Sequence, residues 1–346
     1  MDAQINKFLR PLGSGLAMAV PLVMGILTRD LRICSVGAMG AFSYLAFQHR
    51  SVTYNLKAIM LHGLALLLAF VLGASTAMIP WSAPFIISIL SFVAFIASKV
   101  FRIPKPDYFF VIMLYATGYN FQAASFTGIL QHSTYLLYGI AGSLLSGCLV
   151  SLLEKLPYRV MKEDFQLLSV RDKYRLMLME HPNTLLKALH FSMVLFIATY
   201  IAYLLRDSNG YWVLISAAAV LAGEHMDRIK DRTVGRVLGG IVGLLMGFLL
   251  MSLGLPLVVK ALILVILNVL TELYMPTNYM VANFFTNPQV LLLMTISSNF
   301  TSLTLIPMRF SGTLIGSLLA LVLIFVMERS LQPLQREQIV DDSGGK

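Results

Sequence analysis

The sequence predicts an all-α polytopic membrane protein with about twelve transmembrane helices, and three observations support this prediction. Of the 346 residues, 58% are hydrophobic and only 12% are charged, whereas soluble domains carry about 25% charged residues. Apolar runs of about 20 residues recur along the chain, and this is the length that a helix needs to cross a bilayer. A transmembrane barrel would instead show short segments in which polar and apolar residues alternate.

Twelve apolar segments make up the predicted bundle. In chain order they span residues 12–28, 31–47, 57–79, 81–101, 107–127, 132–153, 185–205, 210–223, 235–253, 256–275, 279–300 and 308–327. The first segment follows Lys7 and Arg10, as the apolar run of a signal peptide would. Arg29 and Asp30 come directly after it, without a cleavage site of small residues. We therefore expect the first segment to be a membrane helix.

The first six segments form one predicted membrane half, residues 1–153. In the fifth segment, Tyr115 and Tyr119 could stack on an aromatic substrate, which makes them candidate binding residues. Asp107 opens the same segment. It is a candidate for proton coupling, and the alternative is a charge that marks the start of a helix.

The second half repeats the plan of the first. Residues 154–184 form a polar stretch that we interpret as a cytoplasmic linker, residues 185–330 form the second six-helix half, and residues 331–346 form a cytoplasmic tail. The eighth segment is short, so we expect its helix to extend into the charged residues that follow.

Similar sequence at corresponding places indicates a direct 6+6 repeat. The run "GSLLSGCLVSLLEK" at 142–155 resembles "GSLLALVLIFVMER" at 316–329, and Arg29-Asp30 corresponds to Arg206-Asp207. Because six crossings return the chain to the same side, the halves would share one orientation and be related by an axis along the membrane normal.

The distribution of Lys and Arg predicts that both termini are cytoplasmic, because loops on that side collect positive charge. With this orientation, only five of the 26 Lys and Arg residues fall outside: Arg29, Arg32, Arg206, Lys260 and Arg309. Trp81, Tyr211 and Trp212 then fall at the outer boundary, where aromatic belts are expected, and we give them no substrate role.

The most densely charged stretch leads into the ninth segment. Arg228, Arg232 and Arg236 recur every four residues, so they line one face of a helix. A second stripe at the same spacing contains only glycines: Gly235, Gly239, Gly243 and Gly247. Small residues at this spacing let two helices approach closely in lipid. We therefore expect a short cytoplasmic helix that continues into a tightly packed membrane helix.

These residues resemble the fusaric acid resistance and aromatic acid exporter family. The resemblance rests on Tyr211-Trp212, an apolar run, and then "DRTVGRVLGGIVG", which contains Arg232, Arg236 and Gly239-Gly240. Gly240 stands where the family commonly has Thr. Many members carry a large soluble domain after each membrane half, and this chain resembles a short form without those domains. The resemblance implies a bacterial plasma-membrane transporter that exports aromatic carboxylates or similar amphipathic anions, driven by the proton gradient.

Two sets of polar residues are candidates for such a function. Arg232 and Arg236 could attract an anion at the inner mouth, because a guanidinium binds both oxygens of a carboxylate; the alternative is contact with lipid headgroups. In the tenth segment, Asn268 and Glu272 share one helix face as further candidates for substrate binding and proton coupling. A carboxylate inside the membrane is often a proton carrier, unless Glu272 lies close enough to the interface to reach water.

The eleventh segment contains Pro288 near its centre, and this proline allows two interpretations. Pro288 cannot bond the carbonyl of Phe284, and Asn287 before it is a favoured N-cap. The segment could therefore consist of two half-helices whose break binds a carboxylate, with Asn283, Asn287 and Pro288 as the site. The alternative is a simple proline kink packed against neighbouring helices.

The sequence argues against several other classes of protein. We find no HExxH, GxSxG or P-loop motif, so we do not expect an enzyme. We expect no cofactor or metal, because Cys34 and Cys148 form no CxxC pair. The net charge of +9 is explained by cytoplasmic loops rather than by nucleic acid.

The expected partners are a small organic anion and the lipid bilayer, and a homo-oligomer is left open. Two alternatives to an exporter remain at this stage. One is an anion channel on a related scaffold, and the other is a non-transporting membrane partner of envelope synthesis.

Overall fold

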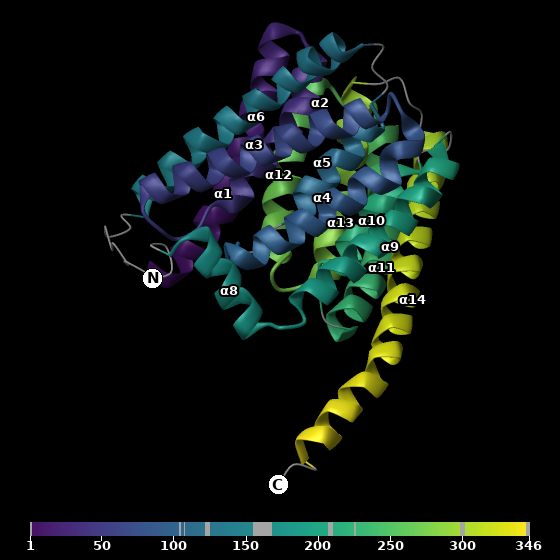
Figure 1. Ribbon diagram of the computed structural model, residues 1–346. Helices are drawn as coiled ribbons and strands as arrows, with labels where there is room; N and C mark the ends of the chain where they lie inside the picture. Colours follow the sequence, from purple (N-terminus) through teal and green to yellow (C-terminus); the bar gives the residue numbers. More distant parts are fainter. Residues whose placement is uncertain are drawn as a thin grey trace.

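The computed structural model of the chain describes residues 2–103, 105–106, 108–121, 125–154, 168–206, 210–224, 226–297 and 302–343. Within these ranges every regular element is a helix (Figure 1). The first part contains α1 (Asp2–Thr28), α2 (Leu31–Gly40), η1 (Ala41–Ala46), α3 (Val52–Thr76), η2 (Pro80–Ser82), α4 (Ala83–Val100), α5 (Phe109–Tyr119) and α6 (Phe126–Leu153). The second part contains α8 (Val170–Glu180), α9 (Thr184–Leu204), α10 (Tyr211–Leu221), α11 (Met226–Ser252), α12 (Leu257–Tyr274), α13 (Tyr279–Ser297) and α14 (Ser302–Ser343).

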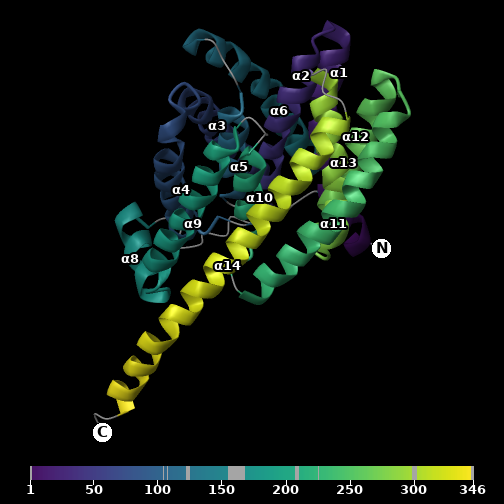
Figure 2. The same ribbon diagram turned by 90° about the vertical axis from the view of Figure 1, so that its right-hand side faces the viewer.

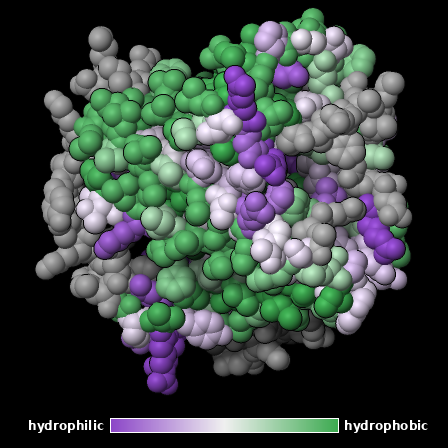
Figure 3. All heavy atoms as spheres, turned by 90° about the horizontal axis from the view of Figure 1, so that it is seen from above, coloured by the Kyte–Doolittle hydropathy of each residue, from purple (hydrophilic) through white to green (hydrophobic). Residues whose placement is uncertain are grey.

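Among the described residues, eight helical spans are long and apolar enough to cross a membrane. They are Lys7–Thr28, Val52–Thr76, Pro80–Val100, Phe126–Leu153, Thr184–Leu204, Met226–Ser252, Leu257–Tyr274 and Leu305–Met327. Shorter apolar helices cover Leu31–Ala46, Phe109–Tyr119 and Tyr211–Leu221. Seen from above, hydrophobic side chains cover much of the surface, and hydrophilic side chains form patches between them (Figure 3). The chain is a multi-pass membrane protein.

The helices of the two halves interleave. Within the first half α3 packs on α5 and α6, and within the second α11 packs on α13 and α14. Between the halves α1 contacts α12, α4 contacts α9, and α5 contacts α10 (Figures 1 and 2). The chain therefore folds as one interlocked bundle in these ranges.

Helix α10 lies at the centre of the second half, and each of its eleven residues is buried. The expectation that this helix extends into the charged stretch is wrong. It ends at Leu221, and Glu224 takes a left-handed conformation (φ 64°) in the turn before α11 begins. The carboxylate of Glu224 forms ion pairs with Lys99 at 2.8 Å and Lys105 at 2.9 Å. The turn therefore places this carboxylate where two lysines neutralise its charge.

The glycine stripe of α11 packs directly against α13. A Cβ atom at Gly239 would lie 2.5 Å from the carbonyl oxygen of Met280, and one at Gly243 would lie 2.6 Å from that of Asn283. The stripe therefore allows a close backbone approach, as expected from small residues in membrane helices. The charged residues from Asp227 onward form the first turns of the same continuous helix.

The polar segments outside the bundle also contain helix. Residues 155–167 of the predicted linker 154–184 lie outside the described residues, and the rest of the linker contains α8. In the tail predicted at 331–346, α14 continues to Ser343 and extends well beyond the other helices (Figures 1 and 2). Both chain ends point toward the end of the bundle where α8 lies.

Candidate functional site

Arg309 lies in the second turn of α14 and is turned into the bundle, with 4% of its surface exposed. Its Nε donates a hydrogen bond to Oδ1 of Asn287 on α13 at 3.0 Å. Its guanidinium lies 3.9 Å from the ring centre of Trp212 on α10, which is cation–π geometry. Its Nη1 is buried without a hydrogen-bond partner.

Arg236, on α11, is a second buried guanidinium, with 9% of its surface exposed. Its Nη1 donates to the hydroxyl of Tyr279 at 3.3 Å, and its Nε is buried without a hydrogen-bond partner. The two arginines therefore reach α13 from two different helices. Each keeps one buried N–H group available for a ligand.

Arg232 lies one turn before Arg236 and connects three helices. Its Nη1 donates to the carbonyl oxygen of Ala219 near the end of α10 at 3.0 Å, where unbonded carbonyls favour a cation. Its guanidinium also lies 4.6 Å from the ring centre of Tyr279. Arg232 therefore positions Tyr279 and the end of α10, and is more exposed than Arg236.

Helix α13 supplies the polar side chains between the arginines, and it is continuous through Pro288. The half-helix interpretation is therefore wrong, and the alternative of a proline packed inside a helix applies. The reason is the packing of α11, since a Cβ at Gly247 would lie 3.2 Å from the Cα of Pro288. Asn283 and Asn287 each donate to the backbone carbonyl four residues earlier, at 2.7 and 2.9 Å.

We call this group the arginine site. It consists of Trp212 on α10, Arg236 on α11, Tyr279, Asn283 and Asn287 on α13, and Arg309 on α14.

The arginine site has a positive charge that its own residues do not neutralise. Among the described residues, neither Arg236 nor Arg309 forms an ion pair with a carboxylate. Guanidinium groups stay protonated in proteins, and an uncompensated buried charge costs several kcal/mol. The arrangement can therefore bind an anion, which would supply both the missing charge and the missing acceptors.

Two of the predicted residues form a different polar cluster. Asn268 donates to the hydroxyl of Ser14 at 2.9 Å and accepts from Nε2 of Gln289 at 3.1 Å, between α1, α12 and α13. One turn along α12, Glu272 forms an ion pair with Nε of Arg10 at 3.1 Å, and its side chain is 11% exposed. This cluster contacts the side of α13 that faces α12. Asn287, by contrast, accepts a hydrogen bond from Arg309 of α14.

The structure does not bring the first-half candidates to the arginine site. The hydroxyl of Tyr115 donates to the carbonyl of Ala83 at 3.3 Å, and that of Tyr119 donates to the carbonyl of Pro80 at 3.4 Å. The two bonds hold α5 against the start of α4 and against η2. Asp107 lies outside the described residues.

Arg309, Trp212 and Tyr279 were not predicted as site residues. Trp212 does not lie in a lipid-facing aromatic belt, and Arg309 does not reach water as a charge near a segment end would, because both side chains are buried. A signal was present in the sequence: Gly312 and Gly316 follow Arg309 on one helix face. A Cβ at Gly312 would lie 2.5 Å from the Cβ of Trp212, so this face packs on α10 and takes Arg309 inside.

Comparison with known proteins gives one family. The model of the fusaric acid resistance protein-like family matches residues 197–323. This range contains every residue of the arginine site, and it confirms the resemblance that the motif around Arg232 and Arg236 indicated. The comparisons with curated proteins and with solved structures give no match.

Proposed function

We propose that this membrane protein is a secondary transporter of organic anions, because the model of the fusaric acid resistance protein-like family matches residues 197–323. Its substrates are aromatic or other amphipathic carboxylates, which it exports across a bacterial plasma membrane. The observation that carries this proposal is the arginine site, where two buried guanidiniums have free N–H groups and no carboxylate partner among the described residues.

The composition of the arginine site suits an aromatic carboxylate. The carboxylate would accept hydrogen bonds from Nε of Arg236 and Nη1 of Arg309, the two N–H groups that lack partners. Charge-assisted bonds of this kind are about twice as strong as neutral ones. The rings of Trp212 and Tyr279 border the same guanidiniums, and they would stack on the apolar part of the substrate.

Proton coupling is assigned to Glu272 in this proposal. Protonation of Glu272 would break its ion pair with Arg10, which joins α12 to α1. The neighbouring residue Thr271 accepts a hydrogen bond from Thr286 of α13 at 3.4 Å. Helix α13 carries Asn283 and Asn287 of the arginine site. A movement of α12 would therefore be transmitted to the arginine site by α13.

The 6+6 repeat with cytoplasmic termini is part of the proposal; the helix contacts support the repeat, and the distribution of Lys and Arg supports the position of the termini. Helices α2 and α6 contact each other as α10 and α14 do, and α3 and α5 contact each other as α11 and α13 do. Across the halves, α1 contacts α12 as α9 contacts α4, and α2 contacts α13 as α10 contacts α5. These are the pairs that a two-fold pseudo-symmetry between the halves would relate.

The test measures how tightly the protein in proteoliposomes binds benzoate and fusaric acid. Arg309→Gln should weaken binding at least about tenfold, since it removes a buried charge-assisted bond, while Arg309→Lys should retain part of the affinity. Lys260→Gln, near the outer end of α12, is the matched control and should leave binding unchanged.

An exporter should also move protons into or out of the vesicles only when substrate is present. A current that follows the voltage alone would identify a channel. Equal binding of both acids by Arg309→Gln and the unchanged protein would contradict the proposed site.

A further inference from the structure

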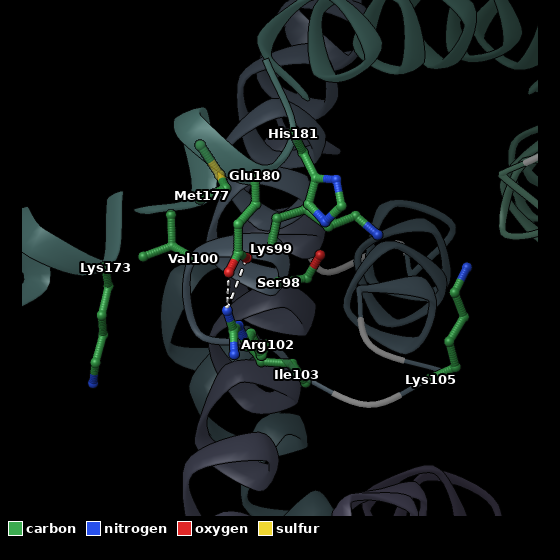
Figure 4. Close-up of a pocket in the computed structure, with 10 residues that line it drawn as sticks. All are labelled: Ser98, Lys99, Val100, Arg102, Ile103, Lys105, Lys173, Met177, Glu180 and His181. Carbon is green, nitrogen blue, oxygen red and sulfur yellow. Dashed lines mark hydrogen bonds and ion pairs between the residues drawn. The ribbon is translucent and has the colours of Figure 1, made fainter. Parts of the chain in front are cut away.

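Polar groups that border a hollow in this bundle differ in whether they have partners. Beside α8 lies a polar cavity of about 440 Å³, and Figure 4 shows an ion pair in its wall, between Arg102 and Glu180 at 2.7 Å. In the arginine site, by contrast, Arg236 and Arg309 each have one buried N–H group without a hydrogen-bond partner. Buried polar groups normally have partners, so a ligand is expected at the arginine site and needs space there.

Gly240 on α11 is buried, yet open space lies in front of it. A Cβ atom at this position would have no atom of the described residues within 4 Å. The four glycines of the stripe differ, because a Cβ at any of them would lie 2.5 to 3.2 Å from an atom of α13. The stripe therefore packs against α13, whereas Gly240 borders a space that no described side chain fills.

The height of this space in the bundle follows from the neighbouring glycines. A Cβ at Gly239 would lie 2.5 Å from the carbonyl oxygen of Met280, and one at Gly243 would lie 2.8 Å from the Cβ of Asn287. Gly240 lies between these two contacts on α11. The space in front of it is therefore level with the segment of α13 between Met280 and Asn287.

The two guanidiniums bond the two ends of this segment. Arg236 precedes Gly240 by four residues, so the two share one face of α11, and it donates to the hydroxyl of Tyr279 just before the segment. Arg309 donates to Asn287 at the other end of the segment. In height, the open space therefore lies between the bonds that the two arginines make to α13.

The open space at Gly240 lowers the stability that the helix could have. Protein interiors are close-packed, and an alanine at this position would fill part of the space and favour the helix. Glycine forgoes both gains and keeps the space open, as functional sites do at the expense of stability. Dry cavities in proteins have apolar linings, so unpartnered guanidiniums at this level indicate a space for a ligand.

We propose that the space in front of Gly240 holds the apolar body of the bound acid, and that residue 240 determines how large a body the site accepts. This inference rests on the function proposed for the arginine site. The carboxylate would bond the guanidiniums, and a ring or a branched alkyl group would fill the space. Acids with a body of this size gain apolar contacts that acetate cannot make.

The experiment compares the affinities of the detergent-solubilised protein for benzoate and acetate. The chain contains two tryptophans, and in a Trp81→Phe background the fluorescence of Trp212 reports on the arginine site. Gly240→Val places a side chain in the open space and should lower the ratio of benzoate affinity to acetate affinity at least about tenfold, since one methylene group changes such selectivity about 10–200-fold. Gly240→Ala should lower this ratio by a smaller factor.

Two control variants separate the size of the acid from its charge and from helix propensity. Arg309→Gln should weaken the binding of both acids by a similar factor and leave their ratio unchanged, because both acids carry the carboxylate. Gly128→Ala lies at the start of α6, where a Cβ would lie 3.5 Å from Oγ of Ser125, and it should leave both affinities unchanged. The thermal midpoint of the ligand-free protein shows whether each variant is folded. If Gly240→Val does not fold, Gly240→Ala provides the test.

The two proposals can fail separately. If the unchanged protein binds benzoate and the folded variants at residue 240 keep its affinity ratio, the inference on Gly240 is overturned and the proposed anion site stands. If the unchanged protein binds neither acid, both proposals are overturned.

Discussion

Asn287 is the only described residue that accepts a hydrogen bond from the buried guanidinium of Arg309. It offers a neutral amide oxygen where a carboxylate would neutralise the charge. A protein optimised only for stability would place an acid at this position. The amide leaves the charge of Arg309 for a ligand, so stability and binding make opposite demands on residue 287.

Asn287→Asp should therefore raise the thermal midpoint of the ligand-free protein and lower its affinity for benzoate. The new carboxylate would pair with Arg309 and occupy the place of the anion, and a charge-assisted bond contributes about 1.5–3 kcal/mol. Thermal unfolding and benzoate titration of one detergent-solubilised sample measure both effects. Asn287→Ala is the control and should lower both quantities. A variant Asn287→Asp that binds benzoate normally would contradict the anion site.

Part of the arginine site could be predicted from single residues, and part could not. Arg236 was a candidate because it continues the arginine face of the charged stretch, and Asn283 and Asn287 were candidates because they precede Pro288. Arg309 lies near the end of an apolar segment, where a charge normally reaches water. Its burial depends on the contact of Gly312 with Trp212, which only the packed helices reveal.

The pairing of α11 with α13 explains why some elements were predicted well and others were not. The four-residue glycine spacing indicated a close contact for α11, and the contact exists. The same spacing did not identify α13 as the partner. That packing holds α13 helical through Pro288, whereas local sequence rules favour a break at this residue.

Gly239 and Gly240 provide a matched test of this contact. A Cβ at Gly239 would lie 2.5 Å from the carbonyl of Met280, whereas one at Gly240 has no neighbour within 4 Å. Gly239→Ala should therefore destabilise the protein by about 1–3 kcal/mol through overpacking. Gly240→Ala should be neutral or stabilising by about 0.5–1 kcal/mol, because Ala favours helix. Equal thermal midpoints for the two variants would contradict the packing of α11 on α13.

The turn between α10 and α11 should be sensitive to acid. Burial raises the pKa of Glu224, but hydrogen bonds from Lys99 and Lys105 outweigh this effect and hold the pKa below its ordinary value. A carboxyl whose pKa is lower in the folded state stabilises the fold above its unfolded pKa of about 4.3. This contribution is lost as the pH falls through the folded pKa.

Glu224→Gln should accordingly have a lower thermal midpoint than the unchanged protein at pH 7. The difference should remain constant down to about pH 5 and shrink below about pH 4. Asp227→Asn, on the exposed start of α11, is the control. A difference that does not change with pH would show that the charge of Glu224 has no stabilising role.

At the scale of the whole molecule, the sequence predicted an all-helical membrane bundle, because composition and segment length depend only on the bilayer. It could not predict how the two halves interlock. The contacts of α1 with α12 and of α4 with α9 join segments far apart in the chain, and no local pattern encodes such pairs. The charge distribution predicts sidedness, which remains open to direct measurement.

Single cysteines measure that sidedness. In a background with Cys34 and Cys148 replaced by Ala, Ser252→Cys at the end of α11 should react with an impermeant maleimide in intact cells. Ser169→Cys before α8 should react only after the membrane is opened, because positively charged segments stay inside. Both positions are exposed in the structure. The opposite labelling pattern would reverse every inner and outer assignment in the proposal.

The complete enclosure of α10 determines which substitutions this membrane protein can tolerate. On α4, Ile89 and Val93 face out of the bundle, with 67% and 56% of their surface exposed, and the hydrocarbon chains of a bilayer adjust to any apolar shape. Around α10 the neighbours are other helices at the density of a protein interior. A systematic substitution scan should therefore find that α4 accepts apolar residues of many sizes, while Ala217 and Ala218 reject even one added methyl group. In α10, the size and shape of a side chain, rather than its hydrophobicity, limit which substitutions are tolerated.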